Sequence, residues 1–109
     1  MKIKISIYTN NYERGKLKFE ELIKNKVAIR LYKTRSQCYF ESDTEIIQTA
    51  PIRQNSRGIK NHFIWIDKGS DYDSDAYLMM KYSIEPLARQ LYDTSEQYEE
   101  NKQLHIKYF

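Results

Sequence analysis

The segment that decides the fold is Asn61-His62-Phe63-Ile64-Trp65-Ile66-Asp67-Lys68-Gly69. Its residues 62–66 form the most apolar run of the chain, without alternation between apolar and polar side chains. A short run of this kind, rich in aromatic and β-branched residues, predicts a strand buried on both faces. Polar residues follow at once, and ligands of open α/β sheets bind at the carboxyl ends of strands. The segment therefore predicts an inner strand that carries the Asp67 carboxylate at its tip.

The rest of the pattern predicts one α/β domain over 1–109, with a mixed sheet of about five strands and two or three helices. Ile3, Ile5 and Ile7 alternate with polar residues, which predicts a strand over 2–8 with one face in water. A second strand is predicted over 27–33, with Val27, Ile29 and Leu31 facing inward. It would form a hairpin with a third strand over 38–40. The remaining strands are expected over 45–49 and 104–109.

Two segments carry helical patterns. The first helix is predicted over 12–25, and residues 9–11 supply its cap. The second is predicted to begin at Ala76 with Ser74 or Asp75 as its cap. Proline is tolerated only in the first turn of a helix, so Pro86 indicates a kink or a fresh helix start.

Composition favours a folded cytoplasmic protein. The chain has ten Tyr, four Phe and one Trp, whereas disordered chains contain few aromatic residues. Its single cysteine, Cys38, has no partner for an internal disulfide, which fits a reducing compartment. No apolar run approaches the roughly 18 residues of a membrane span, and the amino terminus has no signal-peptide pattern. We therefore expect a soluble protein without a membrane partner.

Charge is divided between two halves of the chain. Residues 1–62 contain thirteen Lys and Arg against six Asp and Glu, whereas residues 63–109 contain five against nine. Such a chain could present a basic face to an acidic partner such as nucleic acid. The alternative is that the two halves neutralise each other.

Basic residues gather in two places that suit nucleic acid. Arg53, Arg57 and Lys60 fall in one loop-like segment, and loops on a rigid scaffold concentrate binding residues. Arg30 and Arg35 are interleaved with tyrosines, and tyrosine stacking beside arginine–phosphate contacts is a common way to hold single strands. Tyrosine is also ordinary in strands, so this second pattern has a purely structural alternative.

Residues 3–68 resemble the P-loop ATPase core of large terminases, which package viral DNA. Residues 40–46 are similar to the family's Phe-Glu/Asp-x-Gly-Ser-x-Ile, with Asp43-Thr44 in place of Gly-Ser. Residues 55–58 are similar to its Asn-x-Arg-Gly, and residues 63–67 to its Walker B strand, although Lys68 stands where the family has its catalytic Glu. The phosphate-binding Gly-x-x-x-x-Gly-Lys-Ser/Thr is missing from the chain. The resemblance therefore implies a shortened, non-catalytic relative of viral or mobile-element origin.

The sequence contains few patterns that are typical of a metal site or of an enzyme. Asp71, Asp73 and Asp75 have the first spacings of a calcium loop, but Ala76 and Tyr82 replace its required Gly and Glu. A solvated loop with a helix cap is the favoured interpretation. Asp67, with Asp71 and Asp73, stays a weak metal candidate, and no cofactor is expected.

The carboxyl terminus has two interpretations. Gln103, Ile106 and Phe109 match the Gln-x-x-Ile-x-x-Phe pattern of peptides that bind sliding clamps. The favoured alternative is a last strand over 104–109.

From these patterns we expect a small non-enzymatic binding protein that engages nucleic acid or a nucleic-acid-processing protein. Two alternatives stay open. One is a metal-dependent nuclease or phosphotransfer enzyme centred on Asp67, and the other is a protein–protein inhibitor that uses the carboxyl-terminal tail.

Overall fold

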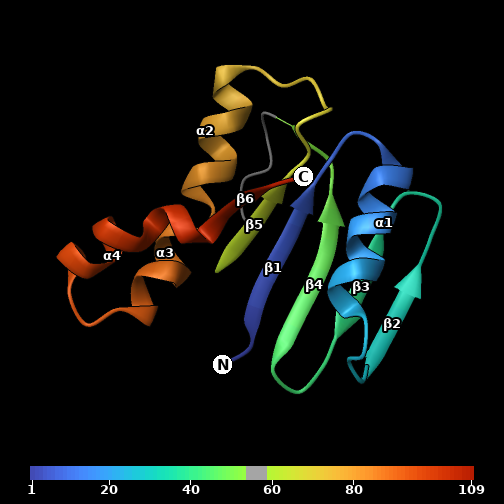
Figure 1. The fold of residues 1–109 in the computed structure, drawn as a ribbon, viewed down its shortest axis with the longest axis horizontal. Coiled ribbons are helices and arrows are strands. Elements are labelled where there is room, and N and C mark those ends of the chain that lie inside the picture. Colours follow the sequence, from blue (N-terminus) through green and yellow to red (C-terminus); the bar gives the residue numbers. More distant parts are fainter. Residues whose placement is uncertain (54–58) are drawn as a thin grey trace.

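The computed structural model describes residues 1–53 and 59–109, which form a six-stranded sheet flanked by helices (Figure 1). The strand order is β2-β3-β4-β1-β5-β6. The strands are β1 (Ile3–Tyr8), β2 (Arg30–Lys33), β3 (Cys38–Glu41), β4 (Glu45–Ala50), β5 (Phe63–Ile66) and β6 (Ile106–Tyr108). The helices are α1 (Tyr12–Ile23), α2 (Ser74–Tyr82), α3 (Glu85–Ala88) and α4 (Ser95–Asn101), with 3₁₀ turns at Arg89–Leu91 and Lys102–His105.

The sheet is mixed, as the sequence predicts. β1 lies between β4 and β5 and runs parallel to both, and β6 extends the parallel part beyond β5. β3 pairs antiparallel with β4 and with β2, so the hairpin expected near residue 36 is present. The predicted α/β class is confirmed, with six strands instead of about five.

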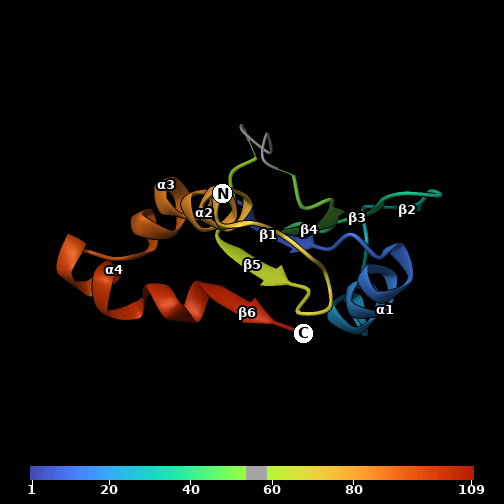
Figure 2. The same ribbon diagram turned by 90° about the horizontal axis from the view of Figure 1, so that it is seen from above.

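Helices cover the two faces of the sheet unequally (Figure 2). On one face, Phe19 of α1 packs in a buried cluster with Ile7, Phe40 and Ile47. On the other face, α2 and α3 bury Ile64 and the rest of a second cluster, which includes Tyr8, Ile66, Met80 and Ile84. Figure 2 shows α2 and α3 on the β1 and β5 side of the sheet, away from β2.

Close packing of α1 depends on Gly15. A Cβ atom at this position would lie 2.5 Å from Thr9 Cγ2, so either the Thr9 side chain or the helix would have to shift to accommodate it. Gly15 weakens α1 by about 1 kcal/mol relative to Ala, but its lack of a side chain allows the helix to pack closely on the sheet.

The inner strand β5 is confirmed, but its two faces differ. Ile64 and Ile66 are fully buried, whereas Phe63 and Trp65 are only partly buried. Trp65 is only partly covered, by Lys18 of α1 and Lys107 of β6, whose Nζ atoms lie 4.4 Å and 5.4 Å from its ring centroid. Burial on both faces was therefore too strong a prediction for this strand.

The prediction for 27–33 was wrong in extent and in burial. The strand begins at Arg30, and Val27, Ile29 and Leu31 are exposed by 88, 63 and 48%. β2 is the edge strand of the sheet, and the described residues leave Leu31 and the segment before β2 largely uncovered. Apolar alternation predicts a strand but does not say whether anything packs against it.

Two further predictions are corrected. The second face of β1 is in water only at Lys4, because α2 and the segment before β5 cover the rest and leave Ser6 and Tyr8 fully buried. Helix α2 begins at Ser74, two residues earlier than predicted, and its cap is Asp73, which accepts a hydrogen bond from Ala76 N at 2.8 Å. Pro86 does mark a fresh start, since it lies in the first turn of α3.

A buried polar group lies at the amino end of β5. His62 is fully buried, and its Nδ1 accepts a hydrogen bond from Lys4 N at 3.0 Å. The neutral ring therefore carries its proton on Nε2, which has no hydrogen-bond partner among the described residues. Burial, followed by the nearby His105 and Lys4, lowers the pKa of His62 from its ordinary value of 6.5.

We predict that His62 makes the fold sensitive to mild acid. Because the folded state disfavours the charged ring, the free energy of unfolding should fall as pH drops below about 6.5 and level off below the lower folded pKa. His62→Asn keeps an acceptor near Lys4 N and removes the titrating ring, so it should flatten this dependence. Urea unfolding at a series of pH values measures it, and an equally steep variant would contradict the assignment.

We predict that Ile64→Ala lowers the free energy of unfolding by about 2–5 kcal/mol, because it removes a fully buried aliphatic side chain. Leu17→Ala is the matched control, since Leu17 is 67% exposed on α1 and its change should stay within about 0.5 kcal/mol. Urea unfolding followed by the fluorescence of the single Trp65 measures both. Equal losses for the two variants would contradict the inner position of β5.

Candidate functional site

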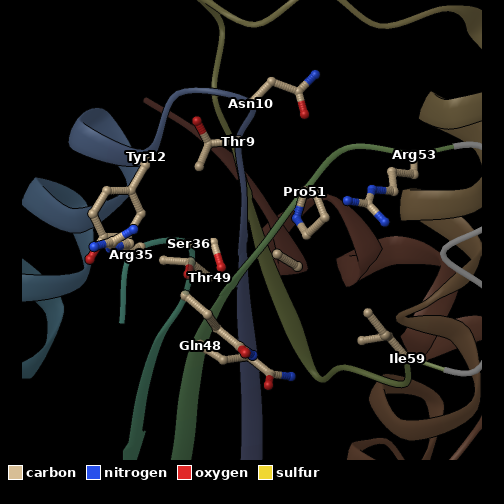
Figure 3. Close-up of a pocket in the computed structure, with 12 residues that line it drawn as sticks. Thr9, Asn10, Tyr12, Arg35, Ser36, Gln48, Thr49, Pro51, Arg53 and Ile59 are labelled. Carbon is tan, nitrogen blue, oxygen red and sulfur yellow. The ribbon is translucent and has the colours of Figure 1, made fainter. Parts of the chain in front are cut away.

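The candidate site is a cleft of about 460 Å³ at the carboxyl ends of β1 and β4 (Figure 3). Figure 3 shows Tyr12 and Arg35 on one side of it and Arg53 and Ile59 on the other. Thr9 and Asn10 follow β1, Pro51 follows β4, and the turn between β2 and β3 closes the remaining side. Its volume lies within the range of small-ligand sites.

Topology explains the position of the cleft. After β1 the chain enters α1 on one face of the sheet, and after β4 it passes to β5 on the far side of β1. A crevice forms where neighbouring parallel strands send their connections in different directions, and ligands of open α/β sheets bind there. Thr9 N donates to Ala50 O at 3.0 Å, and Ile52 N donates to Asn10 Oδ1 at 3.0 Å. These bonds fix the two strand ends that border the cleft.

The turn that presents Arg35 is held to α1. Thr34 N donates to Gln37 O at 2.8 Å, and the Tyr12 hydroxyl donates to Thr34 O at 2.5 Å. The Tyr12 hydroxyl also accepts a weak hydrogen bond from Cys38 Sγ at 3.7 Å. The interaction with Cys38, followed by burial, raises the pKa of Tyr12. Tyr12 therefore stays a neutral donor that anchors one side of the cleft.

The cleft combines cations with neutral polar groups. Arg35 and Arg53 both line it, and no Asp or Glu is found among its described lining residues. Neutral polar side chains complete the lining, namely Thr9, Asn10, Ser36, Gln37, Gln48 and Thr49. Two guanidinium groups in one cleft favour an anionic ligand, for which arginine supplies paired donors.

The structure brings together only some of the basic residues that the sequence singled out. Arg35 and Arg53 line the same cleft although they are predicted in separate groups. Arg30 lies at the opposite end of β2, opposite Glu41 of β3. Lys60 is exposed and is not a lining residue, and Arg57 lies outside the described residues together with the rest of 54–58.

Ion pairs show which charged residues of the two halves contact each other. Arg14 and Asp67 form a pair that joins the basic half to the acidic half. The other lysines of the basic half that form ion pairs between described residues use carboxylates of their own half: Lys2–Glu41, Lys18–Glu21, Lys26–Glu45 and Lys33–Glu20. Four of these five ion pairs therefore lie within the basic half.

Asp67 stands at the tip of β5 as predicted, but its carboxylate is already occupied. Oδ1 accepts from Arg14 Nε at 2.9 Å and from Gly69 N at 2.8 Å, and Oδ2 accepts from Thr9 Oγ1 at 2.7 Å and Ser70 Oγ at 3.1 Å. Burial alone would raise the pKa of Asp67, but these four hydrogen bonds outweigh it and lower the pKa below its ordinary value. The side chain is fully buried and has no oxygen lone pair left for a metal.

The other metal candidates do not join Asp67. Asp71 and Asp73 are exposed, and Asp73 uses its carboxylate to cap α2. Within residues 1–53 and 59–109, no three His, Cys, Asp or Glu side chains form a group able to hold a metal ion.

The carboxyl-terminal residues are built into the sheet. Ile106 begins β6 and is partly buried, and Gln103 precedes it in an exposed 3₁₀ turn. Phe109 N donates to Ile66 O at 3.1 Å, and Lys68 N donates to Phe109 O at 2.9 Å. The strand alternative for the tail is the one that the structure shows, with shorter bounds than 104–109.

Several cleft residues were missed by sequence analysis. Thr9 and Asn10 were considered only as parts of a helix cap, whereas Tyr12 was considered both as the start of a helix and as one of the tyrosines interleaved with basic residues. Polar residues directly after a strand are a usable signal, and β1 ends with the same kind of polar run as β5.

Comparisons with protein-family models, with curated proteins and with solved structures find no match to this chain. No helix in the described part of the chain is long and apolar enough to cross a membrane.

We predict that Asp67→Asn lowers the free energy of unfolding by about 3 kcal/mol, because one of the two oxygens becomes a donor that faces buried donors. Asp43→Asn, in an exposed turn, is the matched control and should have little effect. The lowered pKa gives Asp67 a stabilising contribution above its ordinary value of 3.8 that is lost as pH falls through the folded pKa. In urea unfolding, the free energies of unfolding of the wild type and of Asp67→Asn should therefore converge in acid. A difference between these two free energies that stays constant down to strong acid would contradict the prediction.

Proposed function

We propose that this protein binds nucleic acid through the cleft at the carboxyl ends of β1 and β4. One observation carries the proposal: Arg35 and Arg53, which belong to different segments of the chain, line a common cleft. Backbone phosphates are the ligand that such a surface suits best, because arginine contacts them bidentately and releases their counterions.

The surroundings of the cleft support this choice. Residues 1–62 carry thirteen Lys and Arg against six Asp and Glu, and an excess of positive charge attracts polyanions. The hydroxyl and amide groups in the lining add neutral donors, which commonly contact phosphate and sugar oxygens.

We propose binding without chemistry. The carboxylate best placed for catalysis, Asp67, has all its lone pairs engaged by the fold. The chain also lacks the glycine-rich phosphate loop, although the resemblance to large terminases would place the protein beside nucleic acid. The inhibitor alternative would require the tail to leave the sheet, because residues 106–108 form β6.

We predict that the double change Arg35→Ala and Arg53→Ala weakens binding to DNA and RNA similarly across sequences, because phosphate contacts carry no base information. Loss of two phosphate contacts should also reduce the slope of log affinity against log salt by about two. Fluorescence anisotropy with labelled single- and double-stranded oligonucleotides, at several salt concentrations, measures both effects.

The control removes the same charge far from the cleft. Lys24 caps the far end of α1 and Arg89 lies after α3, so Lys24→Ala with Arg89→Ala should leave most of the affinity intact. Equal losses in the two double variants would show that overall charge, and not the cleft, drives binding. Absence of binding by the wild type at low salt would remove the proposal.

A further inference from the structure

The half of the sheet formed by β2 and β3 has one face without a helix. Leu31 and Phe40 lie opposite each other on the α1 side, so Tyr32 and Tyr39 point to the other face. Figure 2 shows α2 and α3 on the β1 and β5 side of the domain, away from this face. The two tyrosines therefore stand on an open sheet surface that continues toward the cleft along β2.

Tyr32 and Tyr39 form a parallel aromatic stack across the strand pair. Their ring centroids are 5.1 Å apart and the ring planes differ by 9°. Because β2 is the edge strand, no further strand covers the outer side of Tyr32, which is 41% exposed. The stack has room for one more flat ring on that outer side.

Cations flank this stack along β2. Arg30 precedes Tyr32 by two residues on the same face, about 7 Å along the strand. Arg35 follows Tyr32 in the turn that borders the cleft. The carboxylate on this face, Glu41, is paired with Lys2 and accepts a hydrogen bond from the Tyr39 hydroxyl at 3.2 Å. The surroundings of the tyrosines are therefore basic on both sides.

We infer that Tyr32 stacks on a base of a single-stranded nucleic acid whose backbone runs along β2 between Arg30 and Arg35. The inference rests on the proposed function and adds strand selectivity to it. In a duplex the bases are paired and stacked on each other, so their faces are not available to a protein side chain. A ring on an open sheet face with arginines beside it matches the way proteins hold unpaired bases.

The test compares Tyr32→Leu with Tyr32→Phe on two probes. The first is a labelled single-stranded oligothymidine, and the second is an abasic oligonucleotide of the same length. Stacking on one base is worth about 1–3 kcal/mol, so Tyr32→Leu should weaken oligothymidine binding about 5- to 150-fold. Tyr32→Phe keeps the ring and should bind like the wild type. Neither change should matter on the abasic probe, because that probe offers only phosphates and sugars.

Tyr82→Leu is the matched control, since Tyr82 is 56% exposed at the end of α2 and far from β2 in sequence and sheet order. An RNA oligonucleotide in the same assay reports whether ribose or deoxyribose is preferred. Circular dichroism of each variant confirms that it is folded before its affinity is compared.

Three results would overturn the inference. Unchanged oligothymidine affinity of Tyr32→Leu would exclude stacking, as would an equal loss on the abasic probe. Equal affinity of the wild type for oligothymidine and for a duplex would remove the strand selectivity. If any of these occurs while Arg35→Ala with Arg53→Ala still weakens binding, the cleft proposal stands alone. If the wild type binds no oligonucleotide, both fall.

Discussion

The fold depends on one buried carboxylate. Asp67 accepts hydrogen bonds from the end of β1, from the first turns of α1 and from the turn that follows β5. A buried charge is tolerated only when it is fully paired, so each of these segments must keep its position for the carboxylate to stay ionised. Phe109 adds the carboxyl terminus to this arrangement, because its ring lies 5.7 Å from the Arg14 guanidinium and its backbone bonds Lys68. Asp67 thereby ties the first helix and the last strand to the centre of the sheet.

Because Asp67 is engaged in this way, the candidate site is the cleft beside β4 and not the Asp67 carboxylate. Because Thr9 donates to Asp67, the chain turns sharply after β1 and places Asn10 and Tyr12 beside the end of β4. Gly15 then allows α1 to approach the sheet closely enough for Tyr12 to hold the β2–β3 turn. The position of the cleft beside β4 therefore depends on the hydrogen bonds of Asp67 at the end of β5. The position of Asp67 at a strand tip was predicted correctly, and in the structure its carboxylate is engaged by four hydrogen bonds.

Local pattern was enough to predict most elements, and it failed where burial depends on distant parts of the chain. The 62–66 run, the helix after Asn11 and the 36–37 turn all depend on neighbours within a few residues, and each is present. Val27 and Ile29 look like core residues, yet the described residues leave both of them exposed beside the edge strand β2. Ser6 looks like a solvent-facing residue, yet Asn61, far along the chain, accepts its hydrogen bond at 2.6 Å in the core. The cleft could not be predicted as a unit, because the order of strands is what brings Arg35 next to Arg53.

The sheet thus has a closed half and an open half, and charge separates them further. Helices bury both faces around β1 and β5, where Ile64 and Ile66 are fully enclosed and Asp67 is paired. Two lysines close to α1 form ion pairs: Lys33 of β2 pairs with Glu20 of α1, and Lys26, which follows α1, pairs with Glu45 of β4. On the opposite side of β2 and β3, Tyr32 and Tyr39 stand between Arg30 and the cleft arginines, with Glu41 already paired. Close packing in one half fixes the ends of β1 and β4, and the hydrogen bond from Tyr12 to Thr34 O ties the β2–β3 hairpin to this fixed edge. The backbone of the proposed binding surface is thereby preorganised, which lowers the entropic cost of binding a ligand.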